Sequence, residues 1–178
     1  GSVGALLREG LARMEVEGIP HGPVKDPGDT LRVMQREGVT ALVGIPIQVL
    51  SLVKRAQADG LSAPRELRAA LLSTDRLPHV VARMIEEQWG CEVYDHYGAT
   101  EMGLGGGVDC RARAGYHLRE ADLLFEIVDP TTGQPVPEGE DGEVVFSTLT
   151  REAMPLLRYR TGDVAVLDRL LVFGGRGK

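Results

Sequence analysis

Apolar residues in the first half of the chain follow two alternating spacings. Longer stretches carry apolar residues three or four positions apart, which predicts helices that are apolar on one side. Shorter stretches are apolar almost throughout, which predicts strands covered on both faces. This alternation of helices and strands predicts a parallel sheet with right-handed crossovers. The predicted helices cover residues 3–14, 27–37, 46–58 and 78–89, and the predicted strands cover residues 39–43, 67–72 and 91–94.

Two of the predicted helices have an apolar side that should face the core. For the helix that begins at Pro46, this side is expected to contain Ile47, Leu50, Leu52 and Val53. For the helix that begins at Pro78, it is expected to contain Val80, Val81, Met84, Ile85 and Trp89.

The pattern changes after about Arg113. No long helical spacing follows, and apolar runs at residues 123–128, 143–148, 156–159 and 164–167 alternate with turn-forming residues. This pattern predicts a small antiparallel sheet or barrel. The expected fold class is therefore α/β, with a parallel-sheet subdomain at residues 1–113 and a small, barrel-like antiparallel β subdomain at residues 114–178.

Ligands of parallel α/β sheets bind beyond the carboxyl ends of the strands. Three loops are expected there, at residues 44–46, 73–77 and 96–103. The third contains Tyr97, Thr100 and Glu101, which supply a flat ring for a base, a donor for a phosphate and an oxygen ligand for Mg²⁺. Read alone, the same residues also fit a strand that ends in a turn with a solvated Glu101.

A second candidate site lies further along the chain, at Thr161-Gly162-Asp163. A carboxylate after a Thr-Gly turn can accept hydrogen bonds from two vicinal hydroxyls, such as those of a ribose. The alternative interpretation is a β-turn with a solvated Asp163.

Together the two motifs resemble the adenylate-forming superfamily of acyl-CoA synthetases and ligases, in particular its phenylacetate-CoA ligase branch. The resemblance is collinear from about Val39 to the end of the chain. It is carried by Tyr97-Gly98-Ala99-Thr100-Glu101-Met102-Gly103, Gly115-Tyr116-His117, Glu126-Ile127-Val128-Asp129-Pro130-Thr131-Thr132-Gly133, Glu143-Val144-Val145-Phe146 and Met154-Pro155-Leu156-Leu157-Arg158-Tyr159-Arg160-Thr161-Gly162-Asp163.

The resemblance implies a two-step reaction. A carboxylate attacks the α-phosphate of ATP, and a thiol, usually that of coenzyme A, then displaces AMP to give a thioester. The implied substrate is an aryl or phenylacetate-like acid, and the implied cofactors are ATP/AMP, Mg²⁺ and coenzyme A. The alternative is a non-catalytic adenylate-binding or interaction module derived from the same family. An unrelated α/β binding domain is the third hypothesis.

The resemblance also implies roles for individual residues. Tyr97 would lie against adenine with Gly98 beside it, Thr100 would contact the α-phosphate, Glu101 would hold Mg²⁺, and Asp163 would bind the ribose. Ser73, Thr74 and Asp75 stand where relatives carry a Gly-Ala-Glu type segment beside the adenine, and they depart from it in sequence. His96 and Gly103 are the candidates for contact with the acid. Arg160 would either neutralise phosphate charge or lie exposed on the β subdomain.

The composition of the chain limits which classes of binding partner are expected. The 178-residue chain has a net charge of −6 and no run of Lys and Arg, so neither nucleic acid nor a membrane surface is an expected partner. Two cysteines without a disulfide framework fit a reducing, cytoplasmic location. Cys110 and His117 could contribute to a zinc site together with a downstream Cys pair, or they are a free thiol and a turn histidine.

Full members of this superfamily are more than twice as long as this chain. They carry an upstream Ser/Thr/Gly-rich loop around the β- and γ-phosphates and a downstream lid domain, and neither is found here. The chain is therefore expected to be incomplete and inactive alone, with residues absent around Leu167 and Asp168. An uncovered sheet edge and apolar face would favour a homodimer or aggregation.

Overall fold

A computed structural model describes residues 2–103 and 105–167, and the side chains of Ser2 and Val3 are outside its description. The chain divides into two compact units, residues 1–95 and residues 96 onward, and the division falls within strand β3 (Glu92–Tyr97). Each unit is described by itself. The division into two units does not test the subdomain boundary expected near Arg113, which stays a prediction.

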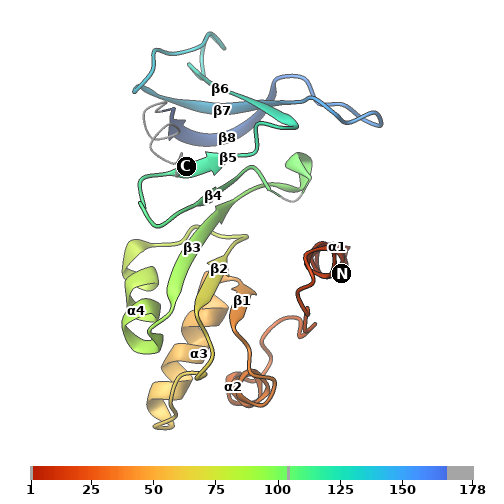
Figure 1. Ribbon diagram of the computed structural model, residues 1–178. Coiled ribbons are helices and arrows are strands. Elements are labelled where there is room, and N and C mark those ends of the chain that lie inside the picture. Colours follow the sequence, from red (N-terminus) through yellow and green to blue (C-terminus); the bar gives the residue numbers. More distant parts are fainter. Residues whose placement is uncertain (1, 104, 168–178) are drawn as a thin grey trace. The chain divides into compact units, whose positions relative to one another are not determined.

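The first unit has the predicted alternation of helices and strands (Figure 1). The helix at Pro46 has the predicted bounds, and the other elements lie within a few residues of theirs. In order, the elements are α1 (Ser2–Arg13), α2 (Pro27–Arg36), β1 (Ala41–Gly44), α3 (Pro46–Ala58), β2 (Ala69–Leu72), α4 (His79–Trp89) and β3.

Local sequence explains where these helices begin and end. Asp26 caps α2 because its side chain accepts a hydrogen bond from the backbone N–H of Asp29 at 2.8 Å, and Pro27 occupies the first helical position. Pro46 begins α3 in the same way. Gly90 ends α4 with φ of +63°, a backbone conformation that glycine adopts without a steric penalty.

Strands β1, β2 and β3 pair in parallel, as the sequence predicted. Gly44 lies beside Leu72, and Leu72 lies beside Asp95. The carboxyl ends of the three strands therefore reach one edge of the sheet together. The loops that follow β1 and β2 leave from this edge, which is where α/β folds bind ligands.

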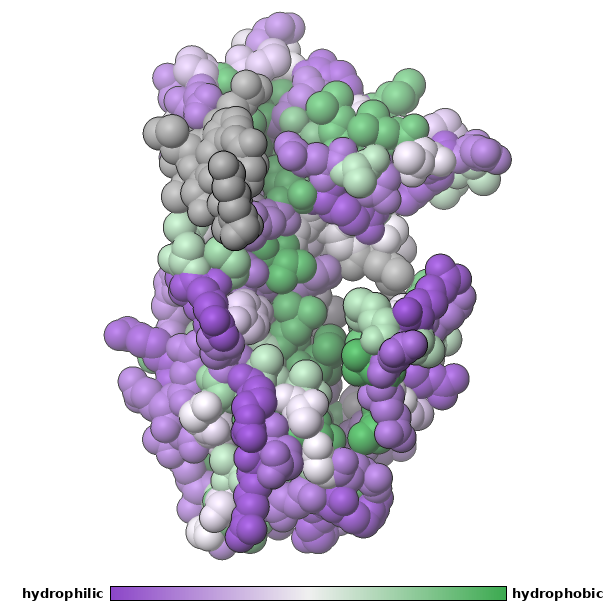
Figure 2. Space-filling model, viewed as in Figure 1, coloured by the Kyte–Doolittle hydropathy of each residue, from purple (hydrophilic) through white to green (hydrophobic). Residues whose placement is uncertain are grey.

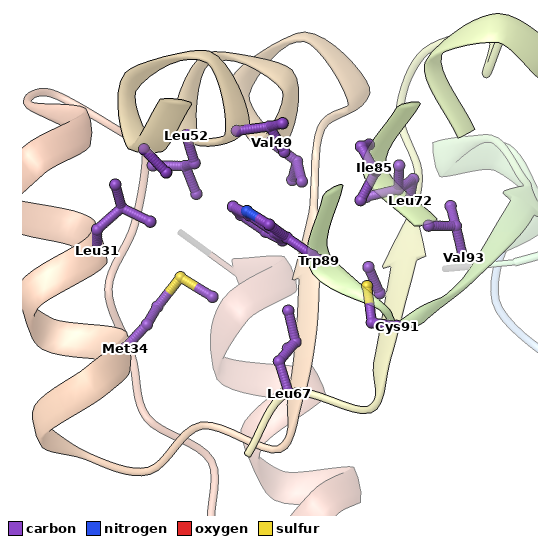
Figure 3. Close-up of a cluster of buried hydrophobic side chains, with 13 residues drawn as sticks. Leu31, Met34, Val49, Leu52, Leu67, Leu72, Ile85, Trp89, Cys91 and Val93 are labelled. Carbon is purple, nitrogen blue, oxygen red and sulfur yellow. The ribbon is translucent and has the colours of Figure 1, made fainter. Parts of the chain in front are cut away.

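The core of the first unit is apolar and lies between the helices and the sheet. Figure 3 shows the Trp89 indole lying among side chains from α2, α3 and the β-strand region. The indole packs within one continuous cluster, which excludes water from the whole layer. The buried members are Leu31, Met34, Val49, Leu52, Val53, Ala56, Leu67, Ala70, Leu72, Ile85, Trp89, Cys91 and Val93.

Three apolar residues expected to be covered are exposed. Ile47 and Val80 are 63% and 60% exposed, and Val43 in β1 is 47% exposed. The buried stripe of α3 runs through Val49, Leu52, Val53 and Ala56, which places Ile47 about 140° around the helix from Leu52. Val80 stands in the same relation to Ile85 in α4. The prediction was wrong for Ile47 and Val80 because it counted apolar residues without fixing the helix phase. Val43 lies in β1, which is at the edge of the described sheet.

The second unit is built from short antiparallel strands and one 3₁₀ turn (Figure 1). His96 and Tyr97 at the end of β3 pair with β4, and β4 pairs with β5. Strands β6, β7 and β8 form a three-stranded antiparallel sheet. The elements are η1 (Thr100–Met102), β4 (Gly107–Asp109), β5 (Tyr116–Leu118), β6 (Leu123–Val128), β7 (Asp141–Thr148) and β8 (Tyr159–Val166).

The sequence predicted β6 with its observed bounds and β7 nearly so. Two other expectations were wrong. The strand expected to end at Tyr94 continues to Tyr97, and the two strands expected at residues 156–159 and 164–167 are the single strand β8. The three-residue strands β4 and β5 were missed, because strands this short carry too few positions to show a period.

One buried cluster of the second unit consists of Met102, Leu123 and Phe146, with Tyr97 and Tyr159 among the half-buried residues packed on it. Val128, Val144 and Val145 are buried as well. Apolar side chains also remain on the surface, in patches among hydrophilic residues (Figure 2). Within residues 2–103 and 105–167, no helix has both the length and the apolar character needed to span a bilayer.

Candidate nucleotide site

The two motifs singled out in the sequence meet in the second unit. The hydroxyl of Tyr97, at the end of β3, donates a hydrogen bond to Oδ2 of Asp163, in β8, at 2.7 Å. The Tyr97 ring is half-buried and lies against the Tyr116 ring, with centroids 5.9 Å apart, whereas Asp163 is exposed. The contact joins residues 66 positions apart.

Burial raises the pKa of Tyr97 to about 12, and the hydrogen bond to Asp163 adds to this shift. The phenol therefore keeps its proton at neutral pH and acts as a donor. A carboxylate has two oxygens with several lone pairs, so a bond to one oxygen leaves acceptor capacity for a ligand hydroxyl.

Asp163 reaches Tyr97 because β8 bulges. Glu143 pairs with Val164 and Val145 pairs with Arg160, so the three residues Thr161, Gly162 and Asp163 oppose the single residue Val144. Gly162 has φ of +78°. The turn expected between two strands is thus a bulge within one strand, and it redirects the Asp163 side chain.

Hydrogen bonds to β7 hold the bulge. Thr161 Oγ1 donates to the Val144 carbonyl at 2.9 Å, and the Gly162 N–H donates to Glu143 Oε1 at 3.1 Å. The other oxygen of Glu143 accepts from Arg160 Nε at 2.9 Å. The Arg160 guanidinium holds the pKa of the Glu143 carboxyl below its ordinary value, and the Glu143 charge raises the pKa of Arg160.

Arg160 is exposed in β8, as the second of its two sequence interpretations has it, and its guanidinium makes structural contacts. In addition to Glu143, its guanidinium donates to the Pro130 carbonyl at 2.6 Å. Arg160 therefore ties the bulge to the turn after β6, and its charge is paired with a carboxylate of the protein.

Thr100 and Glu101 lie in η1 with exposed side chains. The turn is anchored by Met102, which is fully buried, and ends at Gly103 with φ of +69°. The Glu101 side chain thus projects from a short turn whose next residue is fixed in the core.

The glycine-rich segment after η1 packs against His96. A Cβ added to Gly105 would lie 2.5 Å from His96 Nε2, and one added to Gly98 would lie 2.8 Å from the Gly105 backbone. At Gly98 the contact is with backbone and leaves no room for a side chain, whereas a side chain at Gly105 would displace the His96 ring. His96 and Gly98, two predicted site residues, are thus packed together, and Leu104 lies outside the described residues.

Ser73, Thr74 and Asp75 belong to the first unit and follow β2 at the carboxyl edge of its sheet. The Ser73 N–H donates to the Gly44 carbonyl at 3.0 Å, which joins the loops after β1 and β2. Thr74 has φ of +73°, a strained conformation for a β-branched residue that is found most often at functional sites.

The remaining candidates are less informative. Cys110 is a free, half-buried thiol at the end of β4, and His117 lies in β5. No group of three or more His, Cys, Asp or Glu side chains that could hold a metal occurs in residues 2–103 and 105–167. Asp168, beside which residues are expected to be absent, lies outside the described residues.

Sequence reasoning missed Arg119 and Arg151, whose guanidinium groups donate to backbone carbonyls of the η1 segment. Both are isolated arginines in turn-rich stretches, and each lies far along the chain from η1. No local pattern marks an arginine whose partner is a backbone carbonyl brought near by folding.

Residues 12–150 match the family described as AMP-binding enzyme. The chain belongs to this family. It is 40% identical over 127 residues to a phenylacetate-coenzyme A ligase from Thermus thermophilus, in a match that covers 68% of this chain and 28% of the relative. It is 31% identical over 175 residues to a phenylacetate-coenzyme A ligase from Escherichia coli, covering 96% of this chain and 39% of the relative.

Solved structures of AMP-binding enzymes share the fold. An open conformation of 2-hydroxyisobutyryl-CoA ligase, in complex with 2-HIB-AMP and CoA, superposes with a TM-score of 0.82 at 22% identity, over 90% of this chain and 36% of that one. A benzoate CoA ligase from Burkholderia xenovorans gives 0.62 at 17% identity, over 83% and 30%. The chain spans about a third of the length of the curated relatives it matches, between 28% and 39%.

Proposed function

We propose that this chain is the AMP-binding core of an ATP-dependent carboxylate–CoA ligase. The observation that carries the proposal is the hydrogen bond between Tyr97 and Asp163, at 2.7 Å. It brings an aromatic ring suited to a base and a carboxylate suited to a ribose into one site. The relatives that share 31–40% identity with the chain are named phenylacetate-coenzyme A ligases, which supports the same conclusion.

The side chains divide the binding task by their chemistry. The Tyr97 ring offers a face for adenine. Asp163 accepts hydrogen bonds from the ribose hydroxyls, and the bulge that carries it is fixed by Glu143. Thr100 donates its hydroxyl to the α-phosphate. For Ser73, Thr74 and Asp75, which lie in the first unit, the proposed contact with adenine rests on the family resemblance.

Glu101 suits a magnesium site. Mg²⁺ in nucleotide sites is bound by one or two carboxylates together with phosphate oxygens and water, rather than by a cage of protein ligands. An exposed Glu101 fits that arrangement. When bound, Mg²⁺ supplies charge neutralisation at the phosphates.

The proposed reaction has two steps. In the first, an oxygen of the acid attacks the α-phosphorus of ATP, the bond to the bridging oxygen breaks, and pyrophosphate leaves. In the second, the thiol of coenzyme A gives up its proton to solvent and its sulfur attacks the acyl carbon. The bond from that carbon to the phosphate oxygen breaks, and AMP leaves with the bonding pair. Both steps depend on charge stabilisation and orientation, which Thr100, Glu101 and Asp163 provide, rather than on a catalytic base.

The acid is proposed to be aromatic. Beyond the phenylacetate-coenzyme A ligases, a feruloyl-CoA synthase from Amycolatopsis is 29% identical over 161 residues, which cover 80% of this chain. His96, against which the glycine-rich segment after η1 packs, is the proposed contact for the acid together with Gly103.

ATP–pyrophosphate exchange in the full-length protein tests the proposal. We expect exchange with phenylacetate or a related aryl acid, and a fall of about a hundredfold in Glu101→Gln, because lost electrostatic stabilisation of this kind costs 10²–10³ in rate. Glu140→Gln, an exposed glutamate in the turn before β7, is the matched control and should leave exchange unchanged.

No exchange with any aryl or aliphatic acid would contradict the ligase proposal. If the protein then still bound AMP, and Glu101→Gln left that affinity unchanged, the non-catalytic adenylate-binding module would be the better interpretation.

A further inference from the structure

Three consecutive backbone carbonyls of the η1 segment accept hydrogen bonds from arginine side chains. Arg151 Nη2 donates to the Glu101 carbonyl at 2.9 Å. Arg119 Nη2 donates to the Met102 carbonyl at 2.8 Å, and Arg119 Nη1 donates to the Gly103 carbonyl at 3.1 Å. The carbonyl oxygens of Glu101, Met102 and Gly103 are thus each paired with a guanidinium group.

These carbonyls need partners from elsewhere in the chain. A helix leaves its last carbonyl groups without intrahelical donors, and a three-residue 3₁₀ turn has no following turn to supply them. Gly103 turns the chain away with φ of +69°. The two arginines replace the missing donors, and their charge makes each bond stronger than a neutral one.

The arginines are themselves held in place. Arg119 Nε donates to Asp122 Oδ1 at 2.7 Å, so its fork faces the turn in a fixed orientation. Arg119 follows β5, and Arg151 follows β7. Together with Asp122, Thr148 and Thr150, they line a cavity of about 220 Å³ beside Gly103.

We propose that Arg119 and Arg151 are positioning residues for Glu101. They fix the backbone of the turn from one side, so that the exposed Glu101 carboxylate is presented to Mg²⁺ in one geometry. This inference rests on the proposed ligase function. It assigns a role in positioning Glu101 to two arginines that lie outside the motif at residues 97–103. Partners that orient a metal ligand typically change metal affinity 10- to 100-fold when they are removed.

Apolar contacts hold the turn in addition to the arginines. Met102 is buried among Leu123 and Phe146 and anchors the turn through apolar contacts. Removing a guanidinium should therefore loosen the Glu101 backbone without unfolding the unit, which separates a positioning role from a general structural one.

The test uses the full-length protein with Arg151→Met, Arg119→Met and Arg151→Lys. Arg68→Met is the matched control, because Arg68 also donates to a carbonyl and a carboxylate, those of Arg65 and Glu66, but in the first unit. The readouts are the Mg²⁺ dependence of ATP–pyrophosphate exchange, AMP affinity without Mg²⁺, and hydrogen exchange of the amides of residues 99–103.

In both Met variants we expect the Mg²⁺ concentration for half-maximal exchange to rise about tenfold. AMP affinity without Mg²⁺ should stay within about twofold, because the hydrogen bonds given for Arg119 and Arg151 go to the η1 segment and Asp122 rather than to Tyr97 or Asp163. Amides at residues 99–103 should exchange faster than in the wild type. Arg151→Lys should recover part of the Mg²⁺ dependence, since one ammonium can still donate to the Glu101 carbonyl.

Unchanged Mg²⁺ dependence in the Met variants of a protein whose wild type is active would overturn the assignment. A loss of AMP affinity as large as the change in Mg²⁺ dependence would also overturn the assignment, because such a loss would indicate disruption of the whole site. A wild type without pyrophosphate exchange would instead refute the ligase proposal, and the magnesium role of the arginines with it.

Discussion

The two units of the chain differ in their buried cores and in the reach of their arginine contacts. Among the described residues, the first unit has thirteen buried apolar side chains in one cluster, whereas the second has six, of which three form its cluster. Arginines pair with carboxylates in both units, but the pairs described in the first unit join residues at most four positions apart, whereas Arg151 and Arg160 reach partners 50 and 17 positions away. The residues proposed to do the chemistry lie mostly in the second unit.

The difference shows how a scaffold and a site can be stabilised separately. Apolar burial is strong and not directional, so it fixes a fold without fixing a side chain's orientation. Charge-assisted hydrogen bonds depend on direction, so they orient a carboxylate such as Asp163 or a turn such as η1. Substitutions in the first unit should therefore change stability, and substitutions in the second should change ligand affinity.

The largest effect is expected in the core of the first unit. Leu52→Ala should lower the free energy of unfolding by about 3 kcal/mol, because the substitution removes a fully buried side chain and leaves a cavity. Denaturant unfolding measures this change. Leu6→Ala in α1, where the leucine is 47% exposed, is the control and should cost less than about 0.5 kcal/mol.

In the second unit, Asp163→Asn should weaken AMP binding by about tenfold or more, because a hydrogen bond from a ribose to a charged acceptor becomes a neutral one. Titration calorimetry measures the affinity. Asp141→Asn, an exposed aspartate at the start of β7, is the control. If Asp163→Asn leaves the affinity unchanged, Asp163 does not bind the ribose.

Tyr97→Phe should weaken AMP binding by about three- to tenfold, since the phenol no longer holds the Asp163 carboxylate. The change should leave the ring and its packing intact. The same measurement on Tyr159→Phe gives the control, because Tyr159 packs on the same small core. Equal losses in both variants would show that packing, not the hydroxyl, matters.

The hydroxyl of Tyr97 also predicts a pH dependence. Its folded-state pKa of about 12 lies above the ordinary value of 10.0. The folded protein therefore keeps this proton where the unfolded chain has lost it, so the stabilisation is complete below pH 10 and is lost as the pH rises toward 12. Tyrosine absorbance should show one late ionisation in the wild type that is absent from Tyr97→Phe.

The smallest effect is expected at Thr74. Thr74→Gly should raise the free energy of unfolding by about 0.5–1 kcal/mol, because it relieves the strain of a β-branched residue at φ of +73°. Ser62→Gly, at an ordinary backbone conformation, should instead lower it slightly. A Thr74→Gly variant that is less stable than the wild type would mean that the threonine side chain makes a contact worth more than the strain.

Several elements of the fold could be predicted from the sequence. The alternation of helices and strands, the cap at Asp26, the end of α4 at Gly90 and the strand β6 all follow from local patterns. The exposure of Ile47 and Val80 does not, because it depends on helix phase against a partner. The bulge in β8 was predicted as a turn between two strands, because the residues Thr-Gly-Asp favour a change of chain direction both in a turn and in a bulge.

The sequence by itself determined the α/β class, the family motifs and the identity of the residues proposed to bind the nucleotide, because these depend on residue type, spacing and order. Tertiary structure alone decided that Tyr97 donates to Asp163, that Glu143 holds the bulge, and that Arg119 and Arg151 hold the turn of Glu101. The partners in those contacts lie far apart along the chain, and a hydrogen bond depends on distance and direction, which no local pattern encodes.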